Sequence, residues 1–355
     1  MDLYNLGKVP WHESQLIYHA LAKLGREALS LVSPATPYVC IGYHQDAEQE
    51  VDLDYCRRTH IPVFRREVGG GAVYLDGNQL FFQLVLHRDN PAMPKRRESF
   101  YRKFLQPVIH AYRHIGIPAE YKPINDVICG TRKISGTGVG EIGECVVFVG
   151  NLILDFNYEM MARVLRVPDE KFRDKVHKTL KENLSTIRGE LGEEALGRWD
   201  ETRLNSLLIK GFEELLGPMA LREKDQVLQI QMGALAQRMM TDEWLHQKGR
   251  RVSIRDVKIR AGVNVVHKMV KAPGGLLRAD FQVTEGKYSH VSLSGDFFCF
   301  PETAVATLES ALEGRPVSEA RKILECFYKD NEVETPGIVM EDWIEVLTVG
   351  SHLIF

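Results

Sequence analysis

Three consecutive glycines, Gly69 to Gly71, interrupt a region that otherwise has the composition of β-strands. The stretch reads RREVGGGAVYLDGNQLFFQLVLH, and two arginines, Arg65 and Arg66, come just before the glycines. Three glycines in a row are costly to order, because glycine loses more backbone entropy on folding than any other residue. Bare main-chain N–H groups beside two cations suit an elongated ligand that carries carbonyl and phosphate oxygens. We therefore expect a binding segment here, with both arginines able to neutralise phosphate.

The glycines are not needed to reverse the chain, because a turn signal of a different kind follows them. Asp-Gly-Asn at residues 76–78 is a favourable hairpin turn. It predicts that residues 71–74 and 79–86 pair as antiparallel strands.

Composition limits the class of protein. The 355 residues are 44% hydrophobic and 26% charged, with a formal net charge of −3, which argues against binding nucleic acid through phosphate contacts. The chain has no apolar run of about 18 residues and no signal-peptide pattern, so we expect a cytoplasmic protein that binds no membrane. Six scattered cysteines without a Cys-x-x-Cys pair are expected to be free, mostly buried thiols: Cys40, Cys56, Cys129, Cys145, Cys299 and Cys326.

Periodicity and turn residues predict an α+β protein with two domains. Helices are expected at residues 13–29, 52–60, 101–115 and, with interruptions, 158–244, and strands at 38–42, 126–129, 133–140 and 144–156. After residue 249 the pattern changes to strands at 252–270 and 276–295, followed by helices at 301–312 and 318–326. We predict a large domain at residues 1–246 and a small α+β domain at residues 247–355.

Residues 138–143 contain a literal Gly-x-Gly-x-x-Gly, which is typical of dinucleotide-binding sites when a helix follows it. Here the next segment, ECVVFVGNLIL, is rich in β-branched residues and lacks helical spacing. A pyrophosphate would have no helix N-terminus to bind, so we reject NAD binding.

Lys133 begins a strand-like segment and is followed by small residues, Ser135, Gly136 and Thr137. A lysine in such a segment is often an exposed edge residue. Small residues directly after a cation also suit a site where a ligand approaches the backbone. Asn125 and Asp126 supply oxygen ligands of the kind that Mg²⁺ prefers.

Taken together, these motifs resemble the lipoate–protein ligase A family. The resemblance is carried by Arg-Arg-x-x-Gly-Gly-Gly-Ala-Val-x-x-Asp, then Asn-Asp, then Lys-Ile-Ser-Gly, in this order and spacing. It extends through CIGYHQ upstream and NLILDFNYEMMARVLRVPDEKFRDK downstream, and the segments KAPGGLLRADFQVTEG and SGDFF resemble the accessory domain of the family. The resemblance implies the mixed, largely antiparallel sheet shared with biotin protein ligases, followed by a small C-terminal accessory domain.

The same resemblance implies the chemistry. Such ligases join lipoate to ATP with Mg²⁺, forming lipoyl-AMP, and then transfer the lipoyl group to a lysine of an acceptor protein, such as a 2-oxoacid dehydrogenase E2 or a glycine cleavage H protein. Lys133 would be the catalytic residue with an electrostatic role, and Asp126 would help to hold the metal. The remaining lipoate- and adenylate-binding residues would be Arg66, Gly69, Gly70, Gly71, Ala72, Val73, Tyr74, Asn125, Asp126, Ser135, Gly136 and Thr137.

A basic helical face follows these motifs in the sequence. Lys171, Lys175 and Lys178 are spaced i, i+4 and i+7, which is typical of a solvated face. The resemblance places them in or near a mobile adenylate-binding loop, so Lys171 and Lys175 are further candidates.

The chain also departs from the family pattern. Val68 stands where relatives often have serine, and Phe148-Val149-Gly150 stands where they commonly have His-His-Gly. These changes could alter the pocket or the preferred acyl chain.

Three alternatives remain open from the sequence. The chain could be a lipoyl- or octanoyltransferase with a cysteine nucleophile, which would have to be exposed and activated. The segment before Lys133 offers only Cys129, and Cys145 lies in an apolar strand, so we expect both to be structural. The chain could also be a lipoyltransferase without a cysteine nucleophile that accepts preformed lipoyl-AMP. The third alternative is a non-catalytic ligand-binding protein.

Overall fold

The computed structural model describes residues 1–94, 97–248 and 263–349, which form two compact units. The first unit takes in residues 1–40, 51–64 and 73–241. The second takes in residues 41–50, 65–72 and the described residues from 242 onward. Two short segments from the first fifth of the chain therefore belong to the same unit as the C-terminal part. Residues 252–262 of the strand expected at 252–270 lie outside the described residues.

A six-stranded mixed sheet forms the centre of the first unit. Its strands lie in the order β10 (Thr137–Ile142), β11 (Cys145–Ile153), β6 (Gln79–His87), β2 (Ala28–Pro34), β1 (Asp2–Val9) and β12 (Ala220–Leu221). β1 is parallel to both of its neighbours, and the other pairs are antiparallel. The predicted mixed, largely antiparallel sheet is confirmed.

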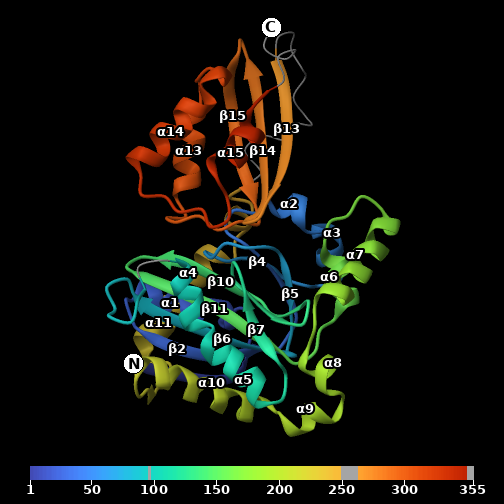
Figure 1. The fold of residues 1–355 in the computed structure, drawn as a ribbon, viewed down its shortest axis with the longest axis vertical. Helices are drawn as coiled ribbons and strands as arrows, with labels where there is room; N and C mark the ends of the chain where they lie inside the picture. Colours follow the sequence, from blue (N-terminus) through green and yellow to red (C-terminus); the bar gives the residue numbers. More distant parts are fainter. Residues whose placement is uncertain (95–96, 249–262, 350–355) are drawn as a thin grey trace. The chain divides into compact units, whose positions relative to one another are not determined.

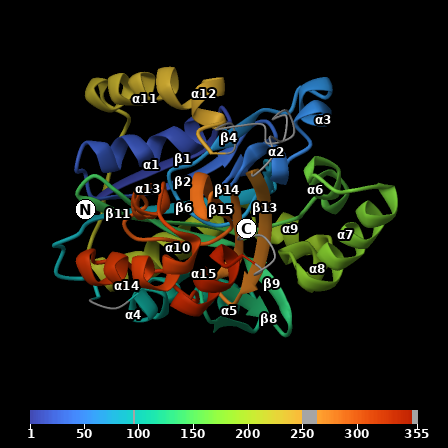
Figure 2. The same ribbon diagram turned by 90° about the horizontal axis from the view of Figure 1, so that it is seen from above.

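The middle strands of this sheet are buried on both faces, because helices cover both. On one face lies α1 (Glu13–Lys23), where Gln83 Nε2 donates a hydrogen bond of 2.5 Å to Ser14 O. On the other face the ring of Phe82 lies 5.8 Å from that of Phe212 in α10 (Glu201–Leu216). A further helix, α11 (Gln226–Met239), lies along α1 (Figure 2). Burial on both sides explains why β2 and β6 read as almost continuous apolar runs.

Two further sheets have three strands each. The strand order of one is β4 (Val63–Arg65), β3 (Tyr38–Ile41) and β5 (Val73–Leu75). The strand order of the other is β7 (Ala119–Lys122), β8 (Asp126–Cys129) and β9 (Arg132–Ser135). The predicted hairpin between residues 71–74 and 79–86 is wrong: β5 pairs with β3, while β6 pairs with β2 and β11. The turn at residues 76–78 passes the chain from one sheet to another, since both edges of β6 are already occupied.

Most predicted helices are confirmed. The remaining helices of the first unit are α3 (Leu53–Arg58), α4 (Arg97–Phe104), α5 (Gln106–His114), α6 (Tyr158–Val164), α7 (Glu170–Asn183), α8 (Ile187–Leu191) and α9 (Glu194–Arg198). Side chains of Asp52, Asn157 and Asp169 accept hydrogen bonds from the first turns of α3, α6 and α7, as N-cap residues do. The first predicted helix is too long, because α1 ends at Lys23 and β2 begins at Ala28.

The second unit contains a small α+β fold, as predicted. Its antiparallel sheet consists of β13 (Val263–Ala272), β14 (Gly275–Thr284) and β15 (Lys287–Gly295). Figure 1 shows the helices α13 (Ala304–Leu312), α14 (Ala320–Asp330) and α15 (Met340–Leu347) beside this sheet, with the short 3-10 helix at Val317–Glu319 before α14. Between them is a buried core that includes Phe281, Tyr288 and Trp343. Two short helices, α2 (Ala47–Glu50) and α12 (Asp242–Leu245), also belong to this unit.

Among the residues that the structure describes, no helix has the length and apolar character required to cross a membrane.

Gly150 offers a test of the packing of the first unit. A Cβ atom added there would lie 2.3 Å from Cζ of Phe82, whose ring is fully buried against Phe148 and Phe212. We expect Gly150→Ala to lower the free energy of unfolding by about 1–3 kcal/mol, because the core must shift to admit the methyl group. The measurement is the midpoint of urea unfolding.

Gly197→Ala is the matched control. Nothing lies within 4 Å of the added Cβ, and the residue is in α9, so a gain of about 0.5–1 kcal/mol is expected from helix propensity. Equal midpoints for the two variants would contradict the packing described for Phe82.

Candidate active site

Lys133 and Asp126 form an ion pair on the β8–β9 hairpin. Lys133 Nζ lies 2.6 Å from Asp126 Oδ1, and the two side chains are 37% and 30% exposed. β8 and β9 are neighbouring antiparallel strands, with Lys133 opposite Ile128. A pair that is half-buried and open to solvent on one side allows the ammonium group to exchange the carboxylate for another anion.

A β-bulge sits next to Lys133. The pairing of β8 with β9 shifts by one residue, so that Ser135 is opposite Val127 while Lys133 is opposite Ile128. The extra residue, Ile134, is fully buried, and its carbonyl accepts a hydrogen bond of 2.6 Å from the hydroxyl group of Tyr112 in α5. Bulges redirect side chains and are common beside active sites.

The small residues after Lys133 are held by a chain of buried amides. Ser135 Oγ donates to Asn151 O at 2.6 Å, and Gly136 N donates to Asn151 Oδ1 at 2.9 Å. Asn151 Nδ2 donates to Gln79 Oε1 at 2.9 Å, and Gln79 Nε2 donates to Tyr74 O at 3.1 Å. Sequence reasoning missed Asn151 and Gln79. The signal was the presence of amide side chains within two strongly apolar strands, which is unfavourable unless their hydrogen bonds are satisfied.

Asn125 and Thr137 tie the start of β8 to the start of β10. Asn125 Nδ2 donates to Thr137 O at 2.7 Å, and Thr137 Oγ1 donates to Asn125 O. The first unit thus brings together most of the predicted site residues through hydrogen bonds and strand pairing: Tyr74, Asn125, Asp126, Lys133, Ser135, Gly136 and Thr137.

Asp126 is the acidic side chain available for a metal at this place. Within the described ranges there is no group of three or more His, Cys, Asp and Glu residues that could hold a metal ion. A single carboxylate with a neighbouring amide still fits Mg²⁺, which commonly takes one or two carboxylates together with substrate phosphates and water. Asp126 and Asn125 meet that requirement.

Lys171 and Lys175 lie on the exposed face of α7. Both are exposed, and none of the 14 residues of α7 is buried. Lys175 Nζ lies 5.2 Å from the centre of the Phe172 ring on the same helix. Figures 1 and 2 both show α7 at the margin of the first unit, away from the six-stranded sheet.

The glycine segment belongs to the second unit, up to Ala72. A Cβ atom on Gly69 would lie 2.7 Å from Phe297 O, and one on Gly42 would lie 1.9 Å from Gly70 O. Gly70 also has φ of +93°, a conformation that other residues rarely adopt. We expected the bare backbone of these glycines to allow the close approach of a ligand. In this unit, other parts of the same chain approach that backbone closely.

Arg66 stabilises the same segment. Its Nη2 donates to Gly69 O at 2.8 Å and to Gly71 O at 3.0 Å. Val73 and Tyr74 follow in the first unit, where Tyr74 N donates to Met161 Sδ at 3.2 Å. The predicted lipoate-binding residues are therefore divided between the two compact units.

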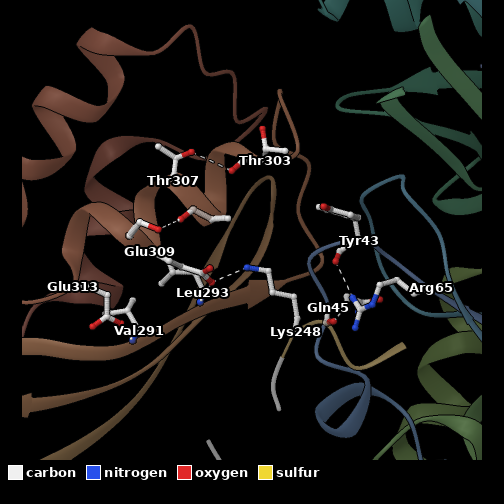
Figure 3. A network of polar contacts seen from close by, with 12 residues as sticks. Tyr43, Gln45, Arg65, Lys248, Val291, Leu293, Thr303, Thr307, Glu309 and Glu313 are labelled. Carbon is white, nitrogen blue, oxygen red and sulfur yellow. Dashed lines mark hydrogen bonds and ion pairs between the residues drawn. The ribbon is translucent and has the colours of Figure 1, made fainter. Parts of the chain in front are cut away.

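Arg65 cannot neutralise a phosphate, so that expectation is wrong. The side chain is fully buried, and Nη1 donates to the carbonyls of Gly42, Tyr43 and Gln45 at 3.1, 2.8 and 2.6 Å (Figure 3). Nη2 donates to Leu245 O at 2.6 Å. A guanidinium group presents its N–H donors in a fixed planar arrangement, and here backbone carbonyls accept the hydrogen bonds from these donors. Arg65 thus joins residues 42–45 to α12 within the second unit.

A second cation of this unit is also satisfied internally. Lys248 Nζ lies 2.7 Å from Glu309 Oε1, with side chains only 13% and 4% exposed (Figure 3). The same carboxylate oxygen accepts a hydrogen bond of 2.8 Å from Leu293 N. This pair is a structural contact between α13 and the chain just after α12.

The two candidate cysteine nucleophiles are buried. Cys129 lies in β8 and Cys145 in β11, and burial raises the pKa of both thiols. A raised pKa disfavours the thiolate, which is the nucleophilic form. The expectation that these cysteines are structural is supported.

The Gly-x-Gly-x-x-Gly segment is not a dinucleotide-binding turn. Residues 138–142 lie in β10, and the chain then turns directly into the antiparallel strand β11. No helix follows directly, so this segment lacks the helix N-terminus that a dinucleotide-binding turn requires.

Two departures from the family pattern are core positions. Phe148 is 1% exposed and packs against the rings of Phe82 and Phe100 at 5.4 and 5.5 Å. Val68 is fully buried, and its carbonyl accepts a hydrogen bond from Tyr43 N. Val149, on the opposite face of β11 from Phe148, is only partly buried.

Comparison with known sequences gives a consistent result. Residues 11–205 match the family model described as lipoyl protein ligase A/B catalytic domain. The lipoate-protein ligase A subunit 1 of Thermoplasma acidophilum is 31% identical over 220 residues, which is 58% of this chain and 79% of that protein. An octanoyltransferase LipM of Kyrpidia tusciae is 24% identical over 262 residues, covering 66% of this chain and 92% of that protein.

Solved structures have the same fold. A bi-partite lipoate protein ligase of T. acidophilum, described with its E2 lipoyl domain, aligns with a TM-score of 0.61 at 27% identity, covering 69% of this chain and 95% of that one. A lipoate-protein ligase A bound with ATP gives 0.56 at 24% identity, covering 69% and 98%. P. falciparum LipL1 in complex with lipoate gives 0.70 at 17% identity and covers 99% of both chains. The last two show similarity of fold, and LipL1 extends it to the C-terminal part.

His44 in the second unit is a buried histidine with no hydrogen bond to its ring. The side chain is 1% exposed, it stacks on Phe297 with ring centres 4.9 Å apart, and neither ring nitrogen has a partner among the described residues. Burial, with smaller contributions from Lys248 and Arg65, lowers the pKa of His44 to about 3. The folded protein therefore keeps this ring neutral.

This neutral ring predicts a pH dependence of stability. As the pH falls below about 6.5, the unfolded chain binds a proton at His44 that the folded chain does not bind until about pH 3. At pH 5 the wild type should lose about 2 kcal/mol relative to pH 7.5 from this group, and His44→Phe should not. Urea unfolding of the second unit at both pH values measures the difference. Identical pH dependence in the two proteins would show that His44 protonates freely in the folded state.

Proposed function

Because the chain belongs to the lipoyl protein ligase A/B catalytic-domain family, we propose that it is an ATP-dependent lipoate–protein ligase. The observation that carries the proposal is the half-exposed Lys133–Asp126 pair, held beside Ser135, Gly136 and Thr137. The alternative is a lipoyl- or octanoyltransferase, and the observation that favours it is the similarity to the octanoyltransferase LipM.

The first step activates the carboxylate of lipoate. One of its oxygens attacks the α-phosphorus of ATP, the bond to pyrophosphate breaks, and lipoyl-AMP forms. Negative charge accumulates where carboxylate and phosphate meet, and a positioned cation is the most effective way to stabilise it. We assign this role to Lys133, whose ammonium exchanges Asp126 for substrate oxygens. Asp126 and Asn125 would hold Mg²⁺, which would supply charge neutralisation for the phosphates.

In the second step the amine of an acceptor lysine attacks the acyl carbonyl. A C–N bond forms, the bond between the acyl carbon and the phosphate oxygen breaks, and AMP leaves with the electron pair while the amine loses a proton. The same Lys133 ammonium stabilises the charge on the departing phosphate. The acceptor that we propose is a lipoyl domain, such as that of a 2-oxoacid dehydrogenase E2 or the glycine cleavage H protein; the solved ligase of T. acidophilum is described with an E2 lipoyl domain.

The glycine segment is proposed to bind lipoate and the adenylate through main-chain groups, from Gly69 to Tyr74. Arg66 would bind phosphate. To do so, Arg66 must break its hydrogen bonds to the carbonyls of Gly69 and Gly71. The glycine segment would then no longer be held by the Arg66 side chain. Lys171 and Lys175 would add positive charge from α7, where both are exposed.

The proposal also covers the organisation and location of the chain. A catalytic domain at residues 1–246 and an accessory domain at residues 247–355 remain our division by function. All six cysteines are free thiols, which supports a reducing compartment such as the cytoplasm.

Lys133→Ala tests the function directly. The chain is mixed with lipoate, Mg·ATP and an isolated lipoyl domain, and pyrophosphate release, lipoyl-AMP and the mass of the acceptor are followed. The wild type should give all three products, and the variant should form adenylate at least about 100-fold more slowly because the developing charge is no longer stabilised.

Lys178→Ala is the matched control, since this exposed lysine pairs only loosely with Glu182 at 3.8 Å. Its rate should stay within about twofold of the wild type. Near-normal adenylate formation by Lys133→Ala would refute the role of that residue, and acceptor modification without ATP would favour the transferase.

Replacing each candidate cysteine in turn distinguishes a ligase from a transferase that binds the acyl group as a cysteine thioester. Cys129→Ser and Cys145→Ser should keep adenylate formation and acceptor modification close to the wild-type rates, because both thiols are buried with raised pKa values. Loss of acceptor modification in either variant, with the melting temperature unchanged, would favour a transferase with a covalent acyl-enzyme.

A further inference from the structure

The segment that follows α7 is attached to the main chain of Lys133. Lys133 and Leu184 form a parallel β-bridge, and Ser185 N donates a hydrogen bond of 2.8 Å to Lys133 O. The hydroxyl group of Tyr158 donates to Leu184 O at 3.2 Å. We call residues 184–186 the root of α7. Because Lys133 also pairs with Ile128 on β8, its backbone has a neighbour on each side.

One carboxylate joins this root to the strand that carries Lys133. Glu190 Oε1, in α8, accepts hydrogen bonds from Arg132 Nη2 at 2.6 Å and from Ser185 Oγ. Ser185 is 2% exposed and the Glu190 side chain 17% exposed, whereas the Arg132 side chain is 40% exposed, so the Ser185–Glu190 contact is the part shielded from water. Charge-assisted hydrogen bonds in such a place are stronger than those on the surface.

The root contrasts with the helix that precedes it. No residue of α7 is buried, whereas Ser185 and Thr186 are, and Thr186 caps α8 through a hydrogen bond from Gly189 N. α7 is attached to the first unit at two places. Its C-terminal end is attached to the backbone of Lys133, and Arg173 Nη1 donates to the carbonyls of Ala162 and Arg163 in α6 at 2.7 and 3.0 Å.

We propose that Glu190 is a positioning residue for Lys133. Its carboxylate holds Arg132 and Ser185 together, so that the backbone of β9 at Lys133 stays fixed against the root of α7 and the Lys133 ammonium keeps its place. This inference rests on the proposed adenylation reaction. Without Glu190, the buried Ser185 hydroxyl loses its acceptor and the Arg132 cation, next to Lys133 in sequence, loses its counter-ion.

Hydrogen exchange tests the attachment without using the reaction. The amide of Ser185, which donates to Lys133 O, should exchange at least about tenfold faster in Glu190→Ala than in the wild type. Glu193→Ala is the matched control: Glu193 lies at the start of α9, is 75% exposed and pairs with Arg188 at 2.7 Å. This control should leave Ser185 unchanged. Equal exchange of Ser185 in all three proteins would overturn the proposal.

The rate of lipoyl-adenylate formation tests positioning. Glu190→Ala should lower kcat by about 10- to 100-fold and leave the KM values for lipoate and ATP within about twofold, since misplacement of a catalytic group affects the transition state more than binding. Glu190→Gln keeps an acceptor for Ser185 and should restore a large part of kcat. Glu193→Ala should match the wild type.

The outcomes are distinguishable. If the wild type forms adenylate and Glu190→Ala has a normal kcat, the positioning role is wrong and the proposed function stands. A fall in melting temperature with normal kcat would mean that Glu190 is only structural. If the wild type forms no adenylate, the proposed function and this inference both fail, although faster exchange at Ser185 would still establish the attachment.

Discussion

The side chains of the candidate site are placed by a sheet that is buried on both faces. Helices on either side leave β6 and β11 no freedom to slide, and Gln79 of β6 and Asn151 of β11 meet within this apolar layer. Gln79 and Asn151 satisfy each other, and Asn151 then binds the backbone at Gly136. An unpaired amide would be costly in such surroundings, so this hydrogen-bond chain fixes the register between the central sheet and the strand that presents Lys133.

A bulge and a bridge complete that placement. Tyr112 holds the extra residue of β9, and the root of α7 lies along the other side of Lys133. The mobile part of a lysine is its long side chain, so rigidity has to come from the backbone that carries it. In this unit the backbone is held from α5, β8 and residues 184–185, and the ammonium is left half-exposed beside Asp126. Such an arrangement suits a cation that must exchange one anionic partner for another.

The sequence was most informative where local pattern and tertiary context agree. The helical region from 158 to 244 follows from residue spacing, and so does the conclusion that residues 138–143 are not a dinucleotide-binding turn; both agree with the structure. The strand expected at 133–140 is instead two strands, β9 and β10, which belong to different sheets because the chain changes sheet at Gly136. The prediction of a hairpin after the glycines is wrong because the turn residues at 76–78 indicate where the chain reverses but not which strand the next segment pairs with. β2 was missed because an apolar run directly after an amphipathic helix can extend that helix or begin a buried strand. The prediction for Arg65 is wrong because the sequence alone does not distinguish a buried arginine that binds carbonyls from an arginine that faces solvent. Asn151, Gln79 and Glu190 depend on contacts between distant segments, which residue spacing does not reveal.

The lack of buried residues in α7 has a consequence for how the chain can change over time. Asp169 caps the first turn of α7 and Arg173 binds carbonyls of α6, but the other side chains of the helix belong to no core. Substitutions at those other positions should cost little folding free energy. With Lys171 and Lys175 kept, drift or deliberate redesign can therefore rewrite the surface charge and shape of α7 while the fold of the first unit is retained.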